Sequence, residues 1–133
     1  MSHPRYFIAV FGEPSEPRKS LVDSGVYGPN PNYAPFPVEP GDLILLYCTA
    51  GYQGHQMEAP GVGVVLSKDL ENIRYRWIPF SNPVPKHLLD RHFEPEDAKK
   101  FGNIRFSSHW LFEISHQSFS KALGDRPVAW AKF

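Results

Sequence analysis

The sequence predicts an α+β protein built on a mixed β-barrel of about five or six strands, with short flanking helices. Short apolar runs rich in β-branched and aromatic residues recur along the chain, as buried strands require. The helical patterns between them are brief. Because strands and long helices do not alternate regularly, a doubly wound parallel sheet is disfavoured.

Length and composition predict a single domain spanning residues 1–133. The chain is near the commonest domain size, and 41% of its residues are hydrophobic, which suffices for a packed core. Its single cysteine excludes an internal disulfide and agrees with a reducing cytoplasm. With no apolar stretch near the ~18 residues of a membrane span and no signal-peptide pattern, we expect a soluble, cytoplasmic protein without membrane contact.

The charges of the chain cancel, with 14 basic and 14 acidic side chains. A protein that held duplex nucleic acid mainly through its phosphates would carry a basic excess, so that mode of binding is disfavoured. The first half, residues 1–66, is mildly acidic and the second half, residues 67–133, mildly basic. This asymmetry is typical of scattered surface charge.

The first predicted strand is Tyr6–Phe11, which is apolar or aromatic throughout and suits a central position covered on both faces. A short helix is expected between Pro17 and Gly25. Five prolines interleaved with aromatic residues follow in residues 28–41. This segment predicts a stiff, extended loop packed over one end of the barrel.

Two neighbouring strands are predicted at Leu43–Tyr47 and Val62–Leu66. Their connector is longer than a tight hairpin needs, so we expect it to form part of the rim of a pocket. The glycines of "GVGVV" at residues 61–65 match no nucleotide-binding loop. They predict instead a close approach between neighbouring backbones.

Clean alternation predicts a further strand at Ile73–Phe80, closed by Pro79. The side chains on its two faces are Ile73, Tyr75 and Trp77 on one, and Arg74, Arg76 and Ile78 on the other. A turn and a short helix around Leu88 are expected next.

The C-terminal third predicts two helices and a strand. Pro95 opens a helix with Gly102 just past its end, and residues 104–114 form a final strand region or a strand that enters a turn. Ser115 caps a last helix that stops at Gly124. The tail, residues 125–133, is expected to add an edge strand that buries Trp130.

Neither a metal nor a cofactor is predicted. Among the six histidines only His87 and His92 are close in sequence, and five residues apart they do not share a helical face well. Cys48 lies where a strand enters a loop, and a neighbouring histidine could activate it as a nucleophile. A lone strand-end cysteine is more commonly a small buried hydrophobe. We therefore assign no catalytic residue, and a small enzyme or small-ligand protein remains the alternative.

Aromatic residues supply the best candidate binding site. Several of them lie in or beside loops and strand ends, next to amide and hydroxyl side chains, which together can hold a flat heterocycle. Core filling explains some of them, and a protein–protein module with an aromatic patch is a further alternative. The aromatic candidates are Tyr27, Tyr33, Phe36, Tyr52, Trp77 and Trp110, and the polar ones are Asn30, Asn32, Thr49, Gln53 and Ser108.

The order of several motifs resembles the EVE domain and the related PUA-like and YTH folds. These motifs are "YFIAVF", "GVYG", "PGDLILLYCT", "GVGVV", "IRYRWIPF" and the closing "FSSHWLFEISHQSFSKAL". The resemblance covers about residues 5–124. It implies a PUA-like β-barrel whose pocket accepts a modified nucleobase, in single-stranded RNA or flipped out of DNA. Nucleic acid is thus the expected partner.

The resemblance also implies which residues line this pocket. The three motifs that contribute are "GVYG", "YCTAGY" and "FSSHW". They supply Val26, Tyr27 and Gly28, then Cys48, Thr49 and Tyr52, then Ser108 and Trp110. Tyr27, Tyr52 and Trp110 are the candidate walls, and Asn30, Thr49 and Ser108 the candidate readers of the base edge. Since Tyr27 replaces a tryptophan of the YTH cage, no methylated adenine is implied.

Overall fold

A computed structural model describes residues 4–11, 25–27, 37–49, 57–69, 72–102 and 110–124, with Trp110 described by its backbone alone. Within these ranges the chain forms six strands and three helices. In order they are β1 (Tyr6–Phe11), β2 (Val26–Tyr27), β3 (Leu43–Cys48), β4 (Glu58–Lys68), β5 (Ile73–Pro85), α1 (Lys86–His92), α2 (Pro95–Gly102), β6 (Trp110–Ile114) and α3 (His116–Leu123).

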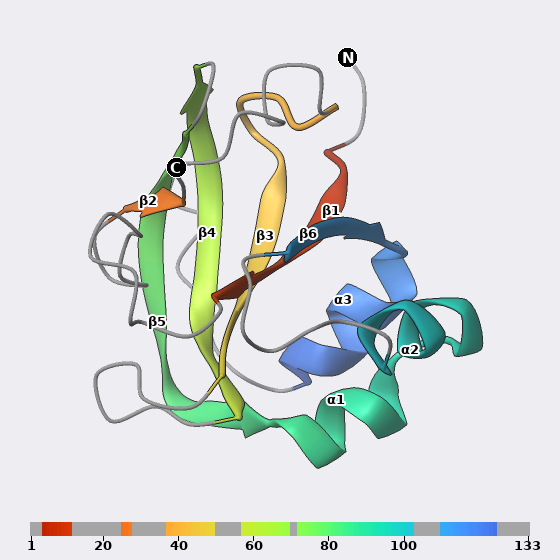
Figure 1. Cartoon of the computed structure of the whole chain (residues 1–133). Helices are drawn as coiled ribbons and strands as arrows, with labels where there is room; N and C mark the ends of the chain where they lie inside the picture. The colour runs from red at the N-terminus through yellow and green to blue at the C-terminus, as the bar shows by residue number, and fades with distance from the viewer. Residues whose placement is uncertain are drawn as a thin grey trace.

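The six strands form one mixed sheet in the order β2-β5-β4-β3-β1-β6. β1 pairs with β3 in parallel, and every other pairing is antiparallel. The sheet curls into a half-barrel, and the helices gather on one side of it (Figure 1). The predicted α+β class and mixed sheet are therefore confirmed.

β1 is the strand around which the two layers of core are built. It lies between β3 and β6, and all its residues from Phe7 to Phe11 have no exposed surface. Ile8 and Val10 point to the side of the helices, whereas the odd-numbered residues point to the opposite side. The prediction of a central strand buried on both faces is confirmed, and it explains the absence of polar residues in this stretch.

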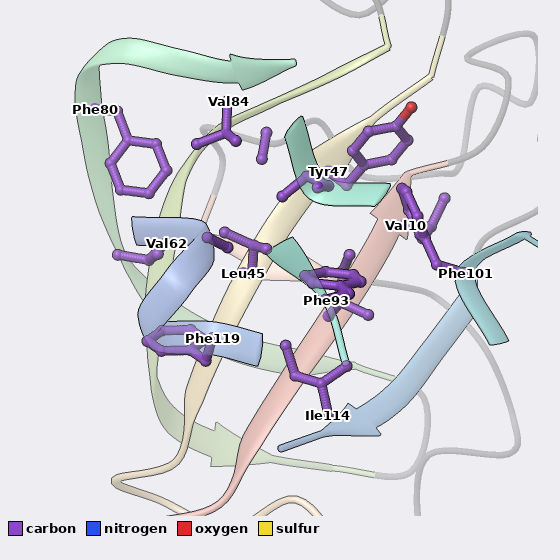
Figure 2. Packing of buried hydrophobic residues seen from close by; sticks show 14 of the residues in the cluster. Val10, Leu45, Tyr47, Val62, Phe80, Val84, Phe93, Phe101, Ile114 and Phe119 are labelled. Carbon is purple, nitrogen blue, oxygen red and sulfur yellow. The ribbon is translucent and has the colours of Figure 1, made fainter. Parts of the chain in front are cut away.

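The core on the helix side joins the sheet to all three helices. Leu45 and Val62 from the strands meet Phe93, Phe101 and Phe119 from the helical half of the chain (Figure 2). The rings of Tyr47 and Phe101 pack edge to face, 4.9 Å apart. Such aromatic pairs add about 0.5–1.5 kcal/mol beyond the burial of their area.

The second core layer covers the opposite face of the sheet. Its members are Phe7, Ala9, Phe11, Tyr27, Val38, Ile44, Leu46, Cys48, Val65, Ile73 and Tyr75, with Trp77 and Leu111 packed against them. Ile73, Tyr75 and Trp77 of β5 thus share this layer, while Ile78 belongs to the helix-side core. The predicted division of β5 into two faces is confirmed.

The glycines of β4 let the large rings of β5 approach its backbone. Gly63 lies opposite Trp77, and a Cβ atom on Gly63 would come within 2.7 Å of the Tyr75 ring. A Cβ atom on Gly61 would collide with the Ile78 carbonyl and lie 2.8 Å from the Trp77 ring. The predicted close approach of backbones at "GVGVV" is therefore confirmed.

The prediction that Pro79 closes β5 is wrong, because the strand continues to Pro85. Proline lacks an N–H group and is tolerated where a strand does not need to donate on both sides. Of the strands described, β2 pairs with β5 only at Ile73 and Arg74. Beyond Tyr75, whose N–H donates to the Gly25 carbonyl, β4 is the only partner of β5 among the described strands, so the missing donors break no ladder described there.

The helix boundaries follow their capping residues. α2 begins at Pro95, as predicted, and it includes Gly102, which was expected just past its end. At the start of α3 the Ser115 hydroxyl accepts a hydrogen bond from the Ser118 N–H at 3.0 Å, and Gly124 follows the last turn, so this prediction is also confirmed. Buried Asp97 then ties α2 to α3, since one of its oxygens accepts from the Ser118 hydroxyl at 2.6 Å.

Four predictions fall outside the residues that the structure describes. They are the short helix between Pro17 and Gly25, the proline-rich loop over residues 28–36, the pocket rim formed by the connector over residues 50–56 and the edge strand of the tail with Trp130. They stay predictions.

We expect Gly61→Ala to lower the free energy of unfolding by about 1–3 kcal/mol, because the added methyl group overpacks the β4–β5 contact. Gly102→Ala is the matched control, since nothing lies within 4 Å of a Cβ atom at that position. Urea denaturation of both variants measures the difference. Equal midpoints for the two would contradict the close approach.

Candidate functional site

The candidate residues converge on the C-terminal end of β1, at Val10 and Phe11. The Tyr27 hydroxyl donates a hydrogen bond to the Val10 carbonyl at 2.7 Å. The Thr49 hydroxyl donates to the Phe11 carbonyl at 2.9 Å, and the Thr49 N–H approaches the same oxygen at 3.3 Å. Two segments that are distant in sequence are thereby fastened to the same two residues.

Tyr27 reaches this point from β2, and its side chain has no exposed surface. Its ring packs edge to face on Phe11, with the ring centroids 4.8 Å apart. Val26, its neighbour in β2, is half-buried and lies opposite Arg74 of β5. Since side chains alternate along a strand, Val26 points to the other face of the sheet. Of this pair only Tyr27 belongs to the cluster around Phe11.

Cys48 and Thr49 come from the end of β3. Cys48 stands beside Phe11 in the parallel register and is fully buried, with a free thiol. Thr49 is 2% exposed, and its hydroxyl proton is engaged by the Phe11 carbonyl. Cys48 and Thr49 are therefore buried residues that support the candidate site from below, and they do not present groups at its surface.

The two candidate tryptophans lie on opposite sides of this cluster in the sheet. Trp110 begins β6 directly opposite Val10, which brings its backbone to the same end of β1. Trp77 is half-buried on β5 and packs against the core layer that contains Phe11, Tyr27 and Cys48. The structure thus brings four of the predicted residues to the end of β1 and places Trp77 against the same layer.

Eight candidate residues lie outside the described ranges. They are Gly28, Asn30, Asn32, Tyr33, Phe36, Tyr52, Gln53 and Ser108. In the sequence Gly28 follows Tyr27 directly, Tyr52 comes three residues after Thr49, and Ser108 two residues before Trp110.

Tyr47 precedes Cys48 in β3 but faces the helices. Burial raises the pKa of its phenol far above the usual value, and the charges of Asp90 and Cys48 act in the same direction. The neutral hydroxyl lies 3.6 Å from the Met57 sulfur. The end of β3 therefore carries a structural phenol on one face and the candidate site on the other.

Within the described ranges, no three histidine, cysteine or acidic side chains gather as metal ligands would. Among the helices of the same ranges, none has the length and apolar character to cross a membrane.

Neither protein-family models nor curated proteins gave a match to this chain. The class of protein that the fold and the site define is thus an α+β half-barrel with a buried aromatic floor at one end of its central strand.

Sequence reasoning missed the centre of this site, because the groups that gather the side chains are the main-chain carbonyls of Val10 and Phe11. Every residue has a backbone carbonyl, so a sequence pattern does not show which carbonyls will accept hydrogen bonds from distant side chains. It also missed a hollow at the other end of β1, where Tyr6 meets His116 and Ser120 of α3. A signal for the hollow existed: these two polar residues lie four apart, on the helix stripe that also carries Phe119 and Leu123.

Tyr27→Phe is expected to lower the free energy of unfolding by about 1–2 kcal/mol, because a buried carbonyl loses its donor. Tyr27→Ala is expected to cost about 3–5 kcal/mol, since it also leaves a cavity beside Phe11. Thermal or urea unfolding distinguishes the two. If Tyr27→Phe is as stable as the wild type, the hydrogen bond to Val10 does not hold β2 in place.

The Cys48 thiol is expected to react with iodoacetamide more slowly than free cysteine in the native protein, and at the ordinary rate in denaturant. The reason is its complete burial against Phe11. Mass spectrometry of timed samples measures both rates. Labelling faster than that of free cysteine would instead favour the reading of Cys48 as an activated nucleophile.

Proposed function

We propose that this chain is a PUA-like, EVE-type binding module that recognises a modified nucleobase in RNA or DNA. The base sits above the end of β1, over the buried floor of Phe11, Tyr27, Cys48 and Thr49. The ligand is single-stranded or carries the base flipped out of a duplex.

The observation that carries this proposal is the convergence at Val10 and Phe11. The resemblance to PUA-like domains named three short motifs, "GVYG", "YCTAGY" and "FSSHW", that are far apart in the sequence. One member of each lies at the end of β1: Tyr27 and Thr49 by hydrogen bonds, and Trp110 by strand register. Motifs that matched by chance would have no reason to meet at one end of one strand.

The buried residues of the floor make the site rigid. Residues close to them in the sequence supply the groups that contact the base. The hydroxyl groups of Tyr27 and Thr49 donate hydrogen bonds to carbonyls of β1. These two residues therefore hold their segments in place instead of contacting the base. Tyr52, three residues after Thr49, is the proposed stacking wall. Asn30 and Ser108 are the proposed edge readers, being able to donate and accept hydrogen bonds.

A binding role suits the residues better than a catalytic one. The one thiol near the site is fully buried, and a nucleophile needs a path to its substrate. Net neutrality is compatible with the proposal, since a pocket that reads a base gains its selectivity from stacking and edge contacts.

Titration of a panel of modified and unmodified oligonucleotides tests the proposal. We expect at least one modified strand to bind more tightly than its unmodified counterpart. Tyr52→Ala is then expected to weaken that binding by about 1–3 kcal/mol, the range found for the loss of one base–aromatic stack.

His87→Ala serves as the control, because it removes an exposed ring from α1, away from β1. It is expected to leave the affinity unchanged. Absence of binding across the whole panel, or equal affinity for every modified and unmodified pair, refutes the proposed function.

A further inference from the structure

The hollow at the start of β1 is separate from the proposed base site at the other end of this strand. Tyr6 and Leu43, which line the hollow, belong to the helix side of the sheet, whereas Phe11 and Tyr27 lie in the opposite core layer. Along β1, Tyr6 and Phe11 are five residues apart, about 16 Å. The lining is completed by one stripe of α3, namely His116, Phe119, Ser120 and Leu123.

The volume of the hollow, about 250 Å³, sets the size of a ligand. A cavity of about 150 Å³ is enough for benzene, so the hollow has room for one aromatic ring and a small substituent. It is smaller than the ~300 Å³ at which pockets for drug-sized molecules begin. The hollow therefore suits a molecule of a single ring.

The inner wall of the hollow is apolar and aromatic. Phe119 is 2% exposed, and Tyr6, Leu43 and Leu123 are partly buried against the helix-side core. The Tyr6 ring lies 5.0 Å from the His116 ring and 5.0 Å from the Phe119 ring, tilted by 41° and 44°. Aromatic rings prefer offset or tilted contacts at such centroid distances, so a ligand ring can join this group by contacts of the same kind.

A hydrogen-bonding pair lies on the exposed side of the hollow. His116 Nε2 and the Ser120 hydroxyl share a hydrogen bond of 3.1 Å, and both residues are exposed. A hydroxyl group and a neutral imidazole can each donate one hydrogen bond and accept another. The pair can therefore bind a substituent that also donates and accepts, such as an amide or a hydroxyl group.

None of the six described residues that line the hollow carries a carboxylate, ammonium or guanidinium group. Arg5, next to Tyr6 in the sequence, has its guanidinium 3.4 Å from the Glu113 carboxylate. A charged ligand would lose hydration without gaining an opposite charge from the lining, which is costly. Because a base within a strand brings phosphates with it, the lining favours a free, uncharged molecule.

Hydrogen bonds on both sides hold the lining in place. Buried Asp42 accepts from the Arg5 N–H at 2.9 Å, and the Leu43 N–H donates to the Arg5 carbonyl at 3.0 Å. These two bonds join the starts of β1 and β3. On the other side, the Ser115 hydroxyl caps α3 by accepting from the Ser118 N–H at 3.0 Å. Since both walls are fixed in advance, a ligand does not have to order them.

We propose that this hollow is a second binding site, for a free, uncharged molecule of one aromatic ring with a single amide or hydroxyl substituent. The ring packs among Tyr6, His116 and Phe119, and the substituent forms hydrogen bonds with Ser120 and His116. This site is independent of base recognition and does not rest on the proposed function.

Titration with benzamide, followed by NMR in buffer above the pH at which histidine ordinarily titrates, tests the proposal. We expect the resonances of Tyr6, His116 and Phe119 to shift and to saturate with a dissociation constant on the order of 1 mM, as suits so small a ligand. Cyclohexanecarboxamide keeps the amide but lacks the aromatic ring, and it is expected to bind about fivefold more weakly. Benzoate is expected to bind more weakly than benzamide because it is charged.

Variants of α3 locate the bound benzamide. Ser120→Trp, at an exposed position, fills the hollow and is expected to abolish the saturable shifts. Lys121→Trp is the matched control, because Lys121 is exposed on the same helix and does not line the hollow. Ser120→Ala removes only the hydroxyl group. It is expected to weaken the binding of benzamide about fivefold and to leave that of toluene unchanged.

Each outcome either supports or overturns the assignment. Saturable binding of benzamide that Ser120→Trp abolishes and Lys121→Trp retains supports it. Absence of saturation, equal shifts in the two tryptophan variants, or benzoate binding as tightly as benzamide overturns it. Displacement of benzamide by an unmodified oligonucleotide also overturns it, since the hollow then takes a base of a strand. The preference for modified strands, which tests the proposed function, is measured separately and is unaffected by any of these results.

Discussion

Backbone carbonyls at the end of a buried strand must find donors, and this requirement organises the fold. β1 is enclosed on both faces, so water cannot satisfy Val10 and Phe11. The chain supplies the Tyr27 hydroxyl to one and the Thr49 hydroxyl to the other. To deliver them, β2 joins the sheet through its pairing with β5, and β3 runs parallel to β1 so that its last residues arrive at the same end.

The two ends of β1 differ in how far they are exposed to solvent. At its start, Asp42 and the Arg5 carbonyl hold β1 and β3 together while Tyr6 remains half-buried beside α3. At its finish, every described group of the cluster is closed away from solvent. The molecule thus has a ring-lined hollow at one end of β1 and a closed cluster at the other.

Much of the fold could be predicted from the sequence, because local patterns specify it. The all-apolar "YFIAVF" marks a strand with two covered faces, and Ser115 with Gly124 marks both ends of α3. Less could be predicted where a residue's role depends on a distant partner. Pro79 looks like a terminator until the pairing of β5 is known, and Asp42 looks like a turn residue until Arg5 is placed beside it. For the candidate site the sequence indicated Tyr27 and Thr49 but not their burial, since burial depends on how the sheet curls.

The prolines of β5 have a consequence for how copies of this protein meet in solution. A long strand with one side unpaired is a template on which another chain can add a strand, and such edges promote aggregation. Where β4 is the only described strand that pairs with β5, Pro79, Pro83 and Pro85 lack the N–H group that an incoming strand would need. The prolines that concealed the true end of β5 are thus the residues of this strand least able to pair with another chain.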